Sequence, residues 1–91
     1  MIISFAHKGL ENFYYKNSLK GINATHAKKL RRILNMLDTI TDLDDIDEPY
    51  QLHLLKGDLK GFHSVKVSGA WRVIFKFTDK GIELIDYLNY H

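Results

Sequence analysis

Hydrophobic residues in the first half of the chain recur at helical spacing. Leu10, Phe13 and Tyr14 lie at positions i, i+3 and i+4, which predicts a first helix that ends near Asn17. The apolar residues within 2–5 come before this helix and predict a short strand. The pattern therefore predicts a strand followed by a helix at the start of the chain.

A broad apolar arc after Gly21 predicts a second helix. Either Asn23 or Thr25 can cap its N-terminus. The side chains that share the arc are Ala27, Leu30, Ile33, Leu34, Met36, Leu37 and Ile40. The opposite arc is basic and carries Lys28, Arg31 and Arg32. We expect the apolar arc to face the core, and the basic arc either to be a solvated surface or to contact RNA.

The hydrophobic period changes to 2 in the second half of the chain. Residues 38–49 form an acidic connector, with a little helix, that ends at the only proline. Strands are expected beyond it near 52–55, 62–67, 70–77 and 82–88. The resulting order β-α-α-β-β-β-β predicts an α+β fold with two N-terminal helices packed on one face of a mostly antiparallel sheet. We expect one domain over residues 1–91.

Two hairpin signals set the expected register of the sheet. A two-residue turn at 68–69 and a four-residue loop at 78–81 would place Arg72 opposite Tyr87, on the same face. The helix-covered face would then carry Trp71, Val73, Phe75, Phe77, Ile82, Leu84 and Leu88, with Asp86 as an exception. The other face would carry Arg72, Tyr87, Asn89 and His91, with Tyr90 beside them. A slip of one residue in either turn would reverse part of this assignment.

The charge of the chain is unevenly distributed. Six of the eleven acidic residues fall in one stretch, namely Asp38, Asp42, Asp44, Asp45, Asp47 and Glu48. The other five acids face thirteen basic residues, so most of the surface is cationic and suits a polyanion such as nucleic acid. Ordinary solubilising charge is the alternative explanation. The absence of cysteine excludes disulfides and thiolate metal sites, and fits a reducing cytoplasm.

The predicted open face has the side chains that RNA cleavage needs. The reaction requires a base for the ribose 2′-hydroxyl, an acid for the leaving 5′-oxygen, and cations that stabilise the phosphorane. His53 and Lys56 come from the first strand of the sheet and its following loop, and Arg72 adds a second cation. Tyr87 could stack on an exposed base. No histidine pair has metal-ligand spacing, so we expect no metal or other cofactor.

The remaining histidines have simpler explanations. His7, His26 and His63 are expected to be surface or hydrogen-bonding residues, because a lone histidine more often has that role. Trp71 is expected to belong to the core rather than to stack on a nucleotide. No apolar run reaches the ~18 residues that a membrane span requires.

Four segments of the chain together resemble the HigB toxins of the RelE-like group. The first is Ile-Ser-Phe at 3–5 with His-Lys-Gly-Leu at 7–10. The second is Leu-His-Leu-Leu-Lys-Gly-Asp at 52–58 with Gly-Phe at 61–62. The third is Gly-Ala-Trp-Arg-Val-Ile-Phe at 69–75, and the fourth is Asp-Tyr-Leu-Asn-Tyr-His at 86–91. The resemblance covers the whole chain.

The resemblance implies a RelE-like fold and a toxin of a type II toxin–antitoxin pair. Such toxins enter the ribosomal A site and cleave messenger RNA without a metal. A HigA-like helix-turn-helix antitoxin neutralises them, and operator DNA is bound only through the complex. A cytoplasmic location and no membrane partner are implied.

The resemblance also assigns roles by position. His53 is similar to the catalytic histidine near the scissile phosphate, Lys56 and Arg72 to its phosphate and transition-state contacts, and Tyr90 and His91 to the C-terminal active-site pair. Lys28, Arg31, Arg32, Tyr87 and Asn89 are then candidate substrate contacts. Asn89 departs from the pattern, because HigB-like chains usually have an acid there.

Two other functions use the same scaffold. ParE-like relatives share the fold but poison gyrase, and a plain RNA-binding module could use the basic arc of the second helix. The retained set of His53, Lys56, Arg72, Tyr90 and His91 favours RNA cleavage over both.

Overall fold

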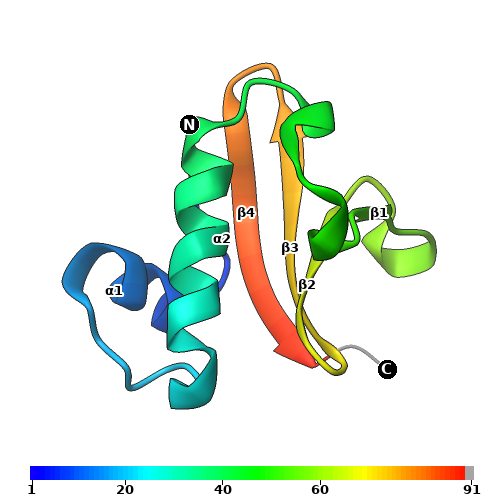
Figure 1. Ribbon diagram of the computed structural model, residues 1–91. Helices are drawn as coiled ribbons and strands as arrows, with labels where there is room; N and C mark the ends of the chain where they lie inside the picture. The colour runs from blue at the N-terminus through cyan, green and yellow to red at the C-terminus, as the bar shows by residue number, and fades with distance from the viewer. Residues whose placement is uncertain (90–91) are drawn as a thin grey trace.

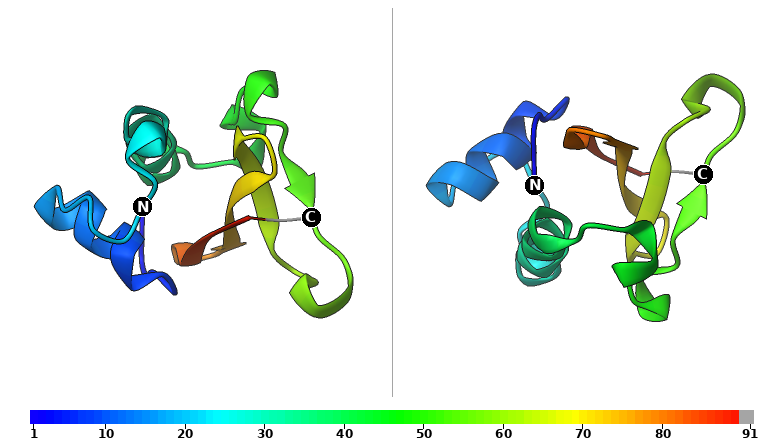
Figure 2. Two further views of the ribbon diagram at one scale, coloured as in Figure 1. Left: turned by 90° about the horizontal axis from the view of Figure 1, so that it is seen from below. Right: turned by 90° about the horizontal axis from the view of Figure 1, so that it is seen from above.

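The computed structural model describes residues 1–89, which form a layer of two helices beside a four-stranded sheet (Figures 1 and 2). The elements are α1 (Lys8–Lys16), α2 (Ala27–Thr39), β1 (His53–Leu54), β2 (His63–Ser68), β3 (Trp71–Thr78) and β4 (Gly81–Asn89). The sheet has the order β1-β2-β3-β4, and each neighbouring pair is antiparallel. The predicted α+β class is confirmed.

The core lies between the helices and one face of the sheet. Its fully buried side chains include Leu10, Leu30, Ile33, Leu34, Leu37, Val65, Val73, Phe75, Ile82 and Ile85. Figure 2 shows both helices on the same side, with β1 at the far side of the molecule. Within the part of the chain that the structure describes, neither helix is long and apolar enough to span a membrane.

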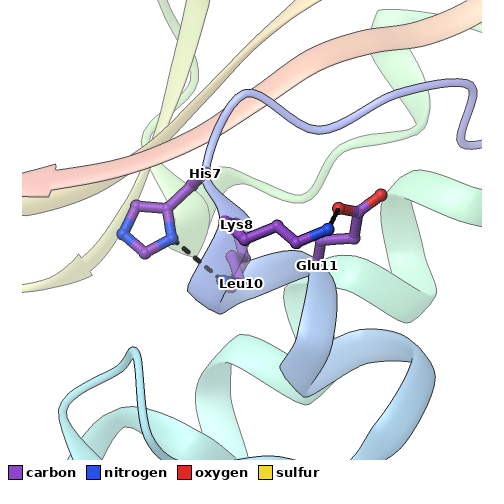
Figure 3. Close-up of polar contacts among 4 residues, drawn as sticks. All are labelled: His7, Lys8, Leu10 and Glu11. Atoms are coloured by element: carbon purple, nitrogen blue, oxygen red, sulfur yellow. Dashed lines mark hydrogen bonds and ion pairs between the residues drawn. The ribbon is translucent and has the colours of Figure 1, made fainter.

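Helix α1 is short and has a cap at each end. The Nδ1 atom of His7 accepts a hydrogen bond from the Leu10 amide at 2.9 Å, which satisfies one of the free N–H groups of the first turn (Figure 3). Asn17 ends the helix in the left-handed conformation, with φ 58°. The exposed pair Lys8–Glu11, at 3.4 Å, contributes little to stability. The predicted helix and its end at Asn17 are confirmed.

The second helical segment begins with a single 3-10 turn, η1 (Ala24–His26), and continues as α2. The side chain of Asn23 caps this turn by accepting from the Thr25 amide at 3.0 Å. The apolar arc faces the core as predicted, with Leu30, Ile33, Leu34 and Leu37 buried.

Arg31 belongs to the contact between the two helices and not to a free basic surface. Its Nη1 donates to the Tyr14 carbonyl at 3.2 Å, and its Nη2 donates to the Phe13 carbonyl at 3.0 Å and also contacts Asn17. The guanidinium lies 4.3 Å from the centre of the Phe13 ring. A cation at the last carbonyls of α1 also complements the helix dipole. The expectation that Arg31 is a substrate contact is therefore corrected, whereas Lys28 and Arg32 are exposed.

The N-terminal residues lie along the outer edge of β4 rather than forming a regular strand. Two isolated parallel bridges, Ile2 to Ile82 and Phe5 to Ile85, join the two segments. Between them the Ser4 hydroxyl accepts a hydrogen bond from the Leu84 amide at 2.9 Å. The predicted strand at 2–5 is thus reduced to two bridges, and it covers an edge that would otherwise expose unpaired backbone groups.

The acidic connector contains two single 3-10 turns, as predicted. They are η2 (Leu43–Asp45) and η3 (Glu48–Tyr50). Asp42 and Asp45 form a reciprocal capping box at the first turn. Some of these carboxylates therefore satisfy local backbone N–H groups.

The turn between β2 and β3 is one residue later than predicted. Ser68 pairs with Trp71, so the turn consists of Gly69 and Ala70, and Gly69 has φ +56°. Glycine adopts this left-handed conformation without the steric cost of a side chain. The pairing shifts by one residue between Lys66 and Ser68, and Arg72 lies opposite Lys66 rather than Val65.

A bulge in β4 changes which of its side chains face the core. Phe77 pairs with Ile82 as predicted, and the pairing shifts between Ile74 and Lys76. Two residues of β4, Leu84 and Ile85, thus lie against one residue of β3. Leu84 has φ +55°, a conformation that a residue with a side chain rarely adopts.

The bulge overturns the predicted faces of β4. Leu84 is 42% exposed and Tyr87 only 5% exposed, whereas Leu84 was expected in the core and Tyr87 on the open face. Arg72 lies opposite Leu88, not Tyr87, and Asn89 lies opposite Trp71. Directly opposed residues share a face, so Leu88 joins Arg72 and Asn89 joins the face that carries Trp71.

Substitution of Arg31 should separate a structural arginine from a solvated one. We expect Arg31→Ala to lower the free energy of unfolding by about 2–3 kcal/mol, because it removes charged hydrogen bonds to two helix carbonyls. Arg32→Ala, at an exposed position on the same helix, should change it by less than about 0.5 kcal/mol. Urea denaturation of both variants measures the difference. Equal stability of the two variants would contradict the role of Arg31.

The bulge predicts an unusual response at Leu84. Left-handed backbone costs a side-chain-bearing residue roughly 1–2 kcal/mol, so Leu84→Gly should leave the free energy of unfolding within about 1 kcal/mol of the parent. Leu84→Val should be less stable than Leu84→Gly, because a β-branched residue tolerates positive φ poorly. Denaturant titration provides the measurement. In a regular strand Leu84 would face the core, and Leu84→Gly would then lose at least the roughly 2–5 kcal/mol typical of large-to-small core changes.

Candidate functional site

One row of side chains crosses the sheet on the face away from the helices, here called the open face. His53 lies opposite Ser64, Ser64 opposite Ile74, and Ile74 opposite Asp86. The row therefore draws one residue from each strand, with the exposed His53 and the half-buried Asp86 at its ends and the buried Ser64 and Ile74 between them. Because opposed residues share a face, His53 at one edge and Asp86 at the other lie on the same side of the sheet.

A second row lies two residues along the strands from the first, on the same face. Lys66 of β2 is opposite Arg72 of β3, and Arg72 is opposite Leu88 of β4. Two cations thus lie side by side on the open face, on the central strands of the sheet. Lys76, on the same face of β3, lies opposite Glu83.

The guanidinium of Arg72 is held by one nitrogen. Its Nη1 donates to the Gly69 carbonyl at 2.6 Å and to the Trp71 carbonyl at 3.0 Å. Within residues 1–89, Nε and Nη2 have no hydrogen-bond partner. An arginine held in this way can still offer a pair of N–H groups to phosphate oxygens.

His53 is the first residue of β1, Lys56 lies in the loop that follows this strand, and both are exposed. The loop is closed by the Leu55 amide, which donates to the Phe62 carbonyl at 2.8 Å. Lys56 directly precedes the 3-10 turn η4 (Gly57–Leu59), where Gly57 has φ +68°. The two side chains are therefore solvent-accessible and come from a segment whose ends are tied together.

Tyr87 is buried behind the sheet and not available to a substrate. Its hydroxyl lies 2.6 Å from Nδ1 of His26, and its ring stacks on Trp71 with centroids 4.7 Å apart. Burial raises the pKa of Tyr87 above its ordinary value. The expected base-stacking role of Tyr87 is thus corrected, and the expected packing of Trp71 against the core is confirmed.

The C-terminal candidates are only partly described. Asn89 is exposed at the end of β4 and belongs by pairing to the face of Trp71. Tyr90 and His91, which were assigned catalytic roles from the resemblance, lie outside the described residues.

The three histidines with expected structural roles differ from one another. His7 caps α1 and His26 bonds to Tyr87, as expected of hydrogen-bonding residues. His63 stacks on Phe75, and its Nδ1 is buried without a hydrogen-bond partner within residues 1–89. Burial lowers the pKa of His63, which favours its neutral form. Residues 1–89 contain no group of three or more side chains suited to hold a metal ion.

Sequence reasoning missed Lys66 and Asp86 as members of the open face. The signal for Asp86 was present, because Leu84 and Ile85 are adjacent apolar residues that break the strict alternation of β4. Such a break is the mark of a bulge, and it moves every later residue to the opposite face. For Lys66, the one-residue error in the turn that follows β2 hid its place opposite Arg72.

Comparison with known proteins identifies a family. The family model for HigB, a RelE-like toxin of a type II toxin–antitoxin system, matches residues 3–91. Endoribonuclease HigB of Proteus vulgaris is 35% identical over 92 residues and is covered completely, as is this chain. Toxin HigB-1 of Vibrio cholerae is 33% identical over 94 residues, which cover 100% of this chain and 98% of that protein.

A solved structure has the same fold. A chain of the YoeB-YefM complex from Staphylococcus aureus superposes with a TM-score of 0.65 and 23% identity, covering 100% of this chain and 95% of that chain. At this identity the likeness concerns the fold, and it confirms the predicted RelE-like architecture. Since the family model spans nearly all of the sequence and both relatives are matched along their length, the chain belongs to the HigB-like family of RelE-like toxins of type II toxin–antitoxin systems.

Proposed function

We propose that this toxin is an endoribonuclease that cuts messenger RNA on the ribosome and thereby inhibits translation. The observation that carries the proposal is the open face, where Arg72 keeps two guanidinium nitrogens unpaired within residues 1–89, beside Lys66 and on the same side as the exposed His53. A full-length relative named Endoribonuclease HigB supports the same activity. A membrane or a small apolar ligand would not need a face of this composition.

The reaction follows from the chemistry of RNA. The 2′-oxygen attacks the adjacent phosphorus, and the bond from phosphorus to the 5′-oxygen breaks, leaving a cyclic phosphate and a 5′-hydroxyl. Arg72 and Lys56 stabilise the additional negative charge of the phosphorane. Histidine can exchange protons near neutral pH, which suits His53 and His91 for acid–base roles. Tyr90 completes the proposed catalytic set.

The surface of α2 supplies a second proposed contact. Lys28 and Arg32 are exposed, and together they would bind the phosphate backbone of the message or of ribosomal RNA without reading its sequence. Asn89 is a proposed substrate contact through its amide, which can donate and accept hydrogen bonds.

An antitoxin is the partner that membership of this family entails. The YoeB chain of similar fold was solved in a complex with YefM, which supports a protein partner for this fold. We propose that the antitoxin of this chain is a HigA-like helix-turn-helix protein, and that operator DNA is bound only through the complex. Action on ribosomes would place the toxin in the cytoplasm.

The test of this function is cleavage of a defined message. Purified toxin should cut a 5′-labelled message on ribosomes that carry it in the A site, and leave a 5′-hydroxyl on the downstream fragment. His53→Ala should slow cutting by about 10²- to 10⁴-fold and Arg72→Ala by about 10²- to 10³-fold, the usual cost of losing a proton-transfer or charge-stabilising group. Lys16→Ala, at an exposed site on α1, is a matched control. Wild-type protein that inhibits gyrase and leaves messages intact would instead support the ParE-like alternative.

The proposed roles of Tyr90 and His91 can be tested by truncation. A chain stopped at Asn89 retains every helix and strand that the structure describes, so its thermal midpoint should stay within a few degrees of the parent while cutting is lost. Asn89→Asp in the complete chain should keep or increase activity, because it restores the acid usual in the family. Circular dichroism and the message assay report the two quantities. Cleavage at the parent rate by the truncated chain would remove both residues from the catalytic set.

A further inference from the structure

Asp86 is an open-face carboxylate whose position depends on the bulge in β4. The shift in pairing at Leu84 moves Asp86 away from the helix-covered face and sets it opposite Ile74. Arg72 lies two residues before Ile74 on β3, so Asp86 and Arg72 are diagonal neighbours. Diagonal neighbours in an antiparallel pair lie roughly 7–8 Å apart, within reach of one bound nucleotide.

One oxygen of the Asp86 carboxylate accepts a hydrogen bond that orients the side chain, and the other oxygen can accept one from a substrate. The Tyr87 amide donates to Oδ1 at 2.8 Å, which restricts the side chain. Within residues 1–89, the other oxygen has no hydrogen-bond partner, and no ion pair joins Asp86 to Arg72. The carboxylate of Asp86 and the guanidinium of Arg72 thus lie near each other on one face without forming an ion pair.

A carboxylate is a costly residue on a surface that binds phosphate. Its negative charge repels the phosphodiester, and the bulge that presents it requires left-handed backbone at Leu84. Bulges near active sites commonly redirect one side chain. Phosphate binding does not explain Asp86, whereas a hydroxyl group of the substrate would.

The order of the strands arranges the candidates as an in-line reaction needs. In such a displacement the attacking and leaving oxygens lie on opposite sides of phosphorus. Arg72 and Lys66 occupy the two central strands, with Asp86 on the outer strand β4 and His53 on the outer strand β1. A phosphate held by the central cations would have a carboxylate on one side and an imidazole on the other.

We propose that Asp86 is a catalytic residue that accepts the hydrogen bond, and then the proton, of the ribose 2′-hydroxyl. This inference rests on the proposed ribonuclease function. The 2′-oxygen forms the new bond to phosphorus as its proton passes to the free oxygen of Asp86. The bond between phosphorus and the 5′-oxygen breaks, and that oxygen receives a proton from the imidazolium of His53. The products are a 2′,3′-cyclic phosphate and a 5′-hydroxyl, so charge and protons balance.

Asp86→Asn tests the proton transfer. The asparagine side chain has the same shape as aspartate but cannot act as a base. Single-turnover cleavage of a ribosome-bound message should therefore slow by about 10²- to 10⁴-fold. Affinity for the message should be equal or greater, because a negative charge is removed from the open face. Glu83→Gln is the matched control, since Glu83 lies on the same strand opposite Lys76 and is bonded to the Thr78 hydroxyl. The control should cut within about threefold of the parent.

A binding measurement tests the hydroxyl contact without cleavage. In the slow-cutting His53→Ala background, the toxin should bind a message with one 2′-deoxy nucleotide at the cleavage position about five- to tenfold more weakly than the all-ribose message, the usual worth of a hydrogen bond. Asp86→Ala in the same background should lose most of this preference, because alanine cannot accept the hydrogen bond, and Asp86→Glu should keep part of it and of the rate. If Asp86→Asn does not fold, Asp86→Glu still tests whether the position of the carboxylate matters for binding and cutting.

The outcomes are distinguishable from those of the proposed function. Cutting by Asp86→Asn within about threefold of the parent, or an unchanged preference for the 2′-hydroxyl in Asp86→Ala, would overturn the role of Asp86 while leaving the ribonuclease intact. A parent toxin that cuts no message would overturn the ribonuclease proposal and this inference with it.

Discussion

The left-handed backbone at Leu84 is the constraint on which the two faces of the sheet depend. Without the extra residue, Ile85 and Tyr87 would point away from the helices and Asp86 would point into the core. The amide of Leu84 donates to the Ser4 hydroxyl, so the N-terminal segment stabilises the bulge from the side. A local distortion of one strand therefore determines both the hydrophobic core and the polar surface opposite it.

The sequence predicted the helices well because their signals are local and redundant. Apolar residues at helical spacing in both segments, and cap candidates at Asn23 or Thr25 before the second, indicate where the helices lie, so an error in one signal would be corrected by another. The structure adds His7 as the cap of α1. Strand pairing has no such redundancy. The side-chain period is 2, so the unrecognised residue at Val67 changes the pairing of β2 with β3, and the one at Leu84 reverses the faces of the rest of β4. This is why Arg72 was assigned to the correct face with the wrong partners, and why Tyr87 was misplaced.

Candidate site residues could be recognised by type but not by environment. Arg31 and Arg72 look alike in sequence, as basic residues within regular elements. In the structure Nη1 and Nη2 of Arg31 are hydrogen-bonded to carbonyls of α1 and to Asn17, whereas Arg72 is held by Nη1 alone. The difference depends on where the end of another helix lies, which is a tertiary property. Composition and spacing contain no record of it.

The pairing of the N-terminal segment with β4 has a consequence for how the toxin is made. Ser4 and Leu84 are 80 positions apart, and the bridges at Ile2 and Phe5 join equally distant parts of the chain. Contacts of such long sequence separation form late, because a large loop must close first. While the chain is being synthesised, β4 has to leave the ribosome before the bulge can be held and the open face assembled. The covered edge of β4 and the open face are thus completed only at the end of synthesis, after both helices have already been made.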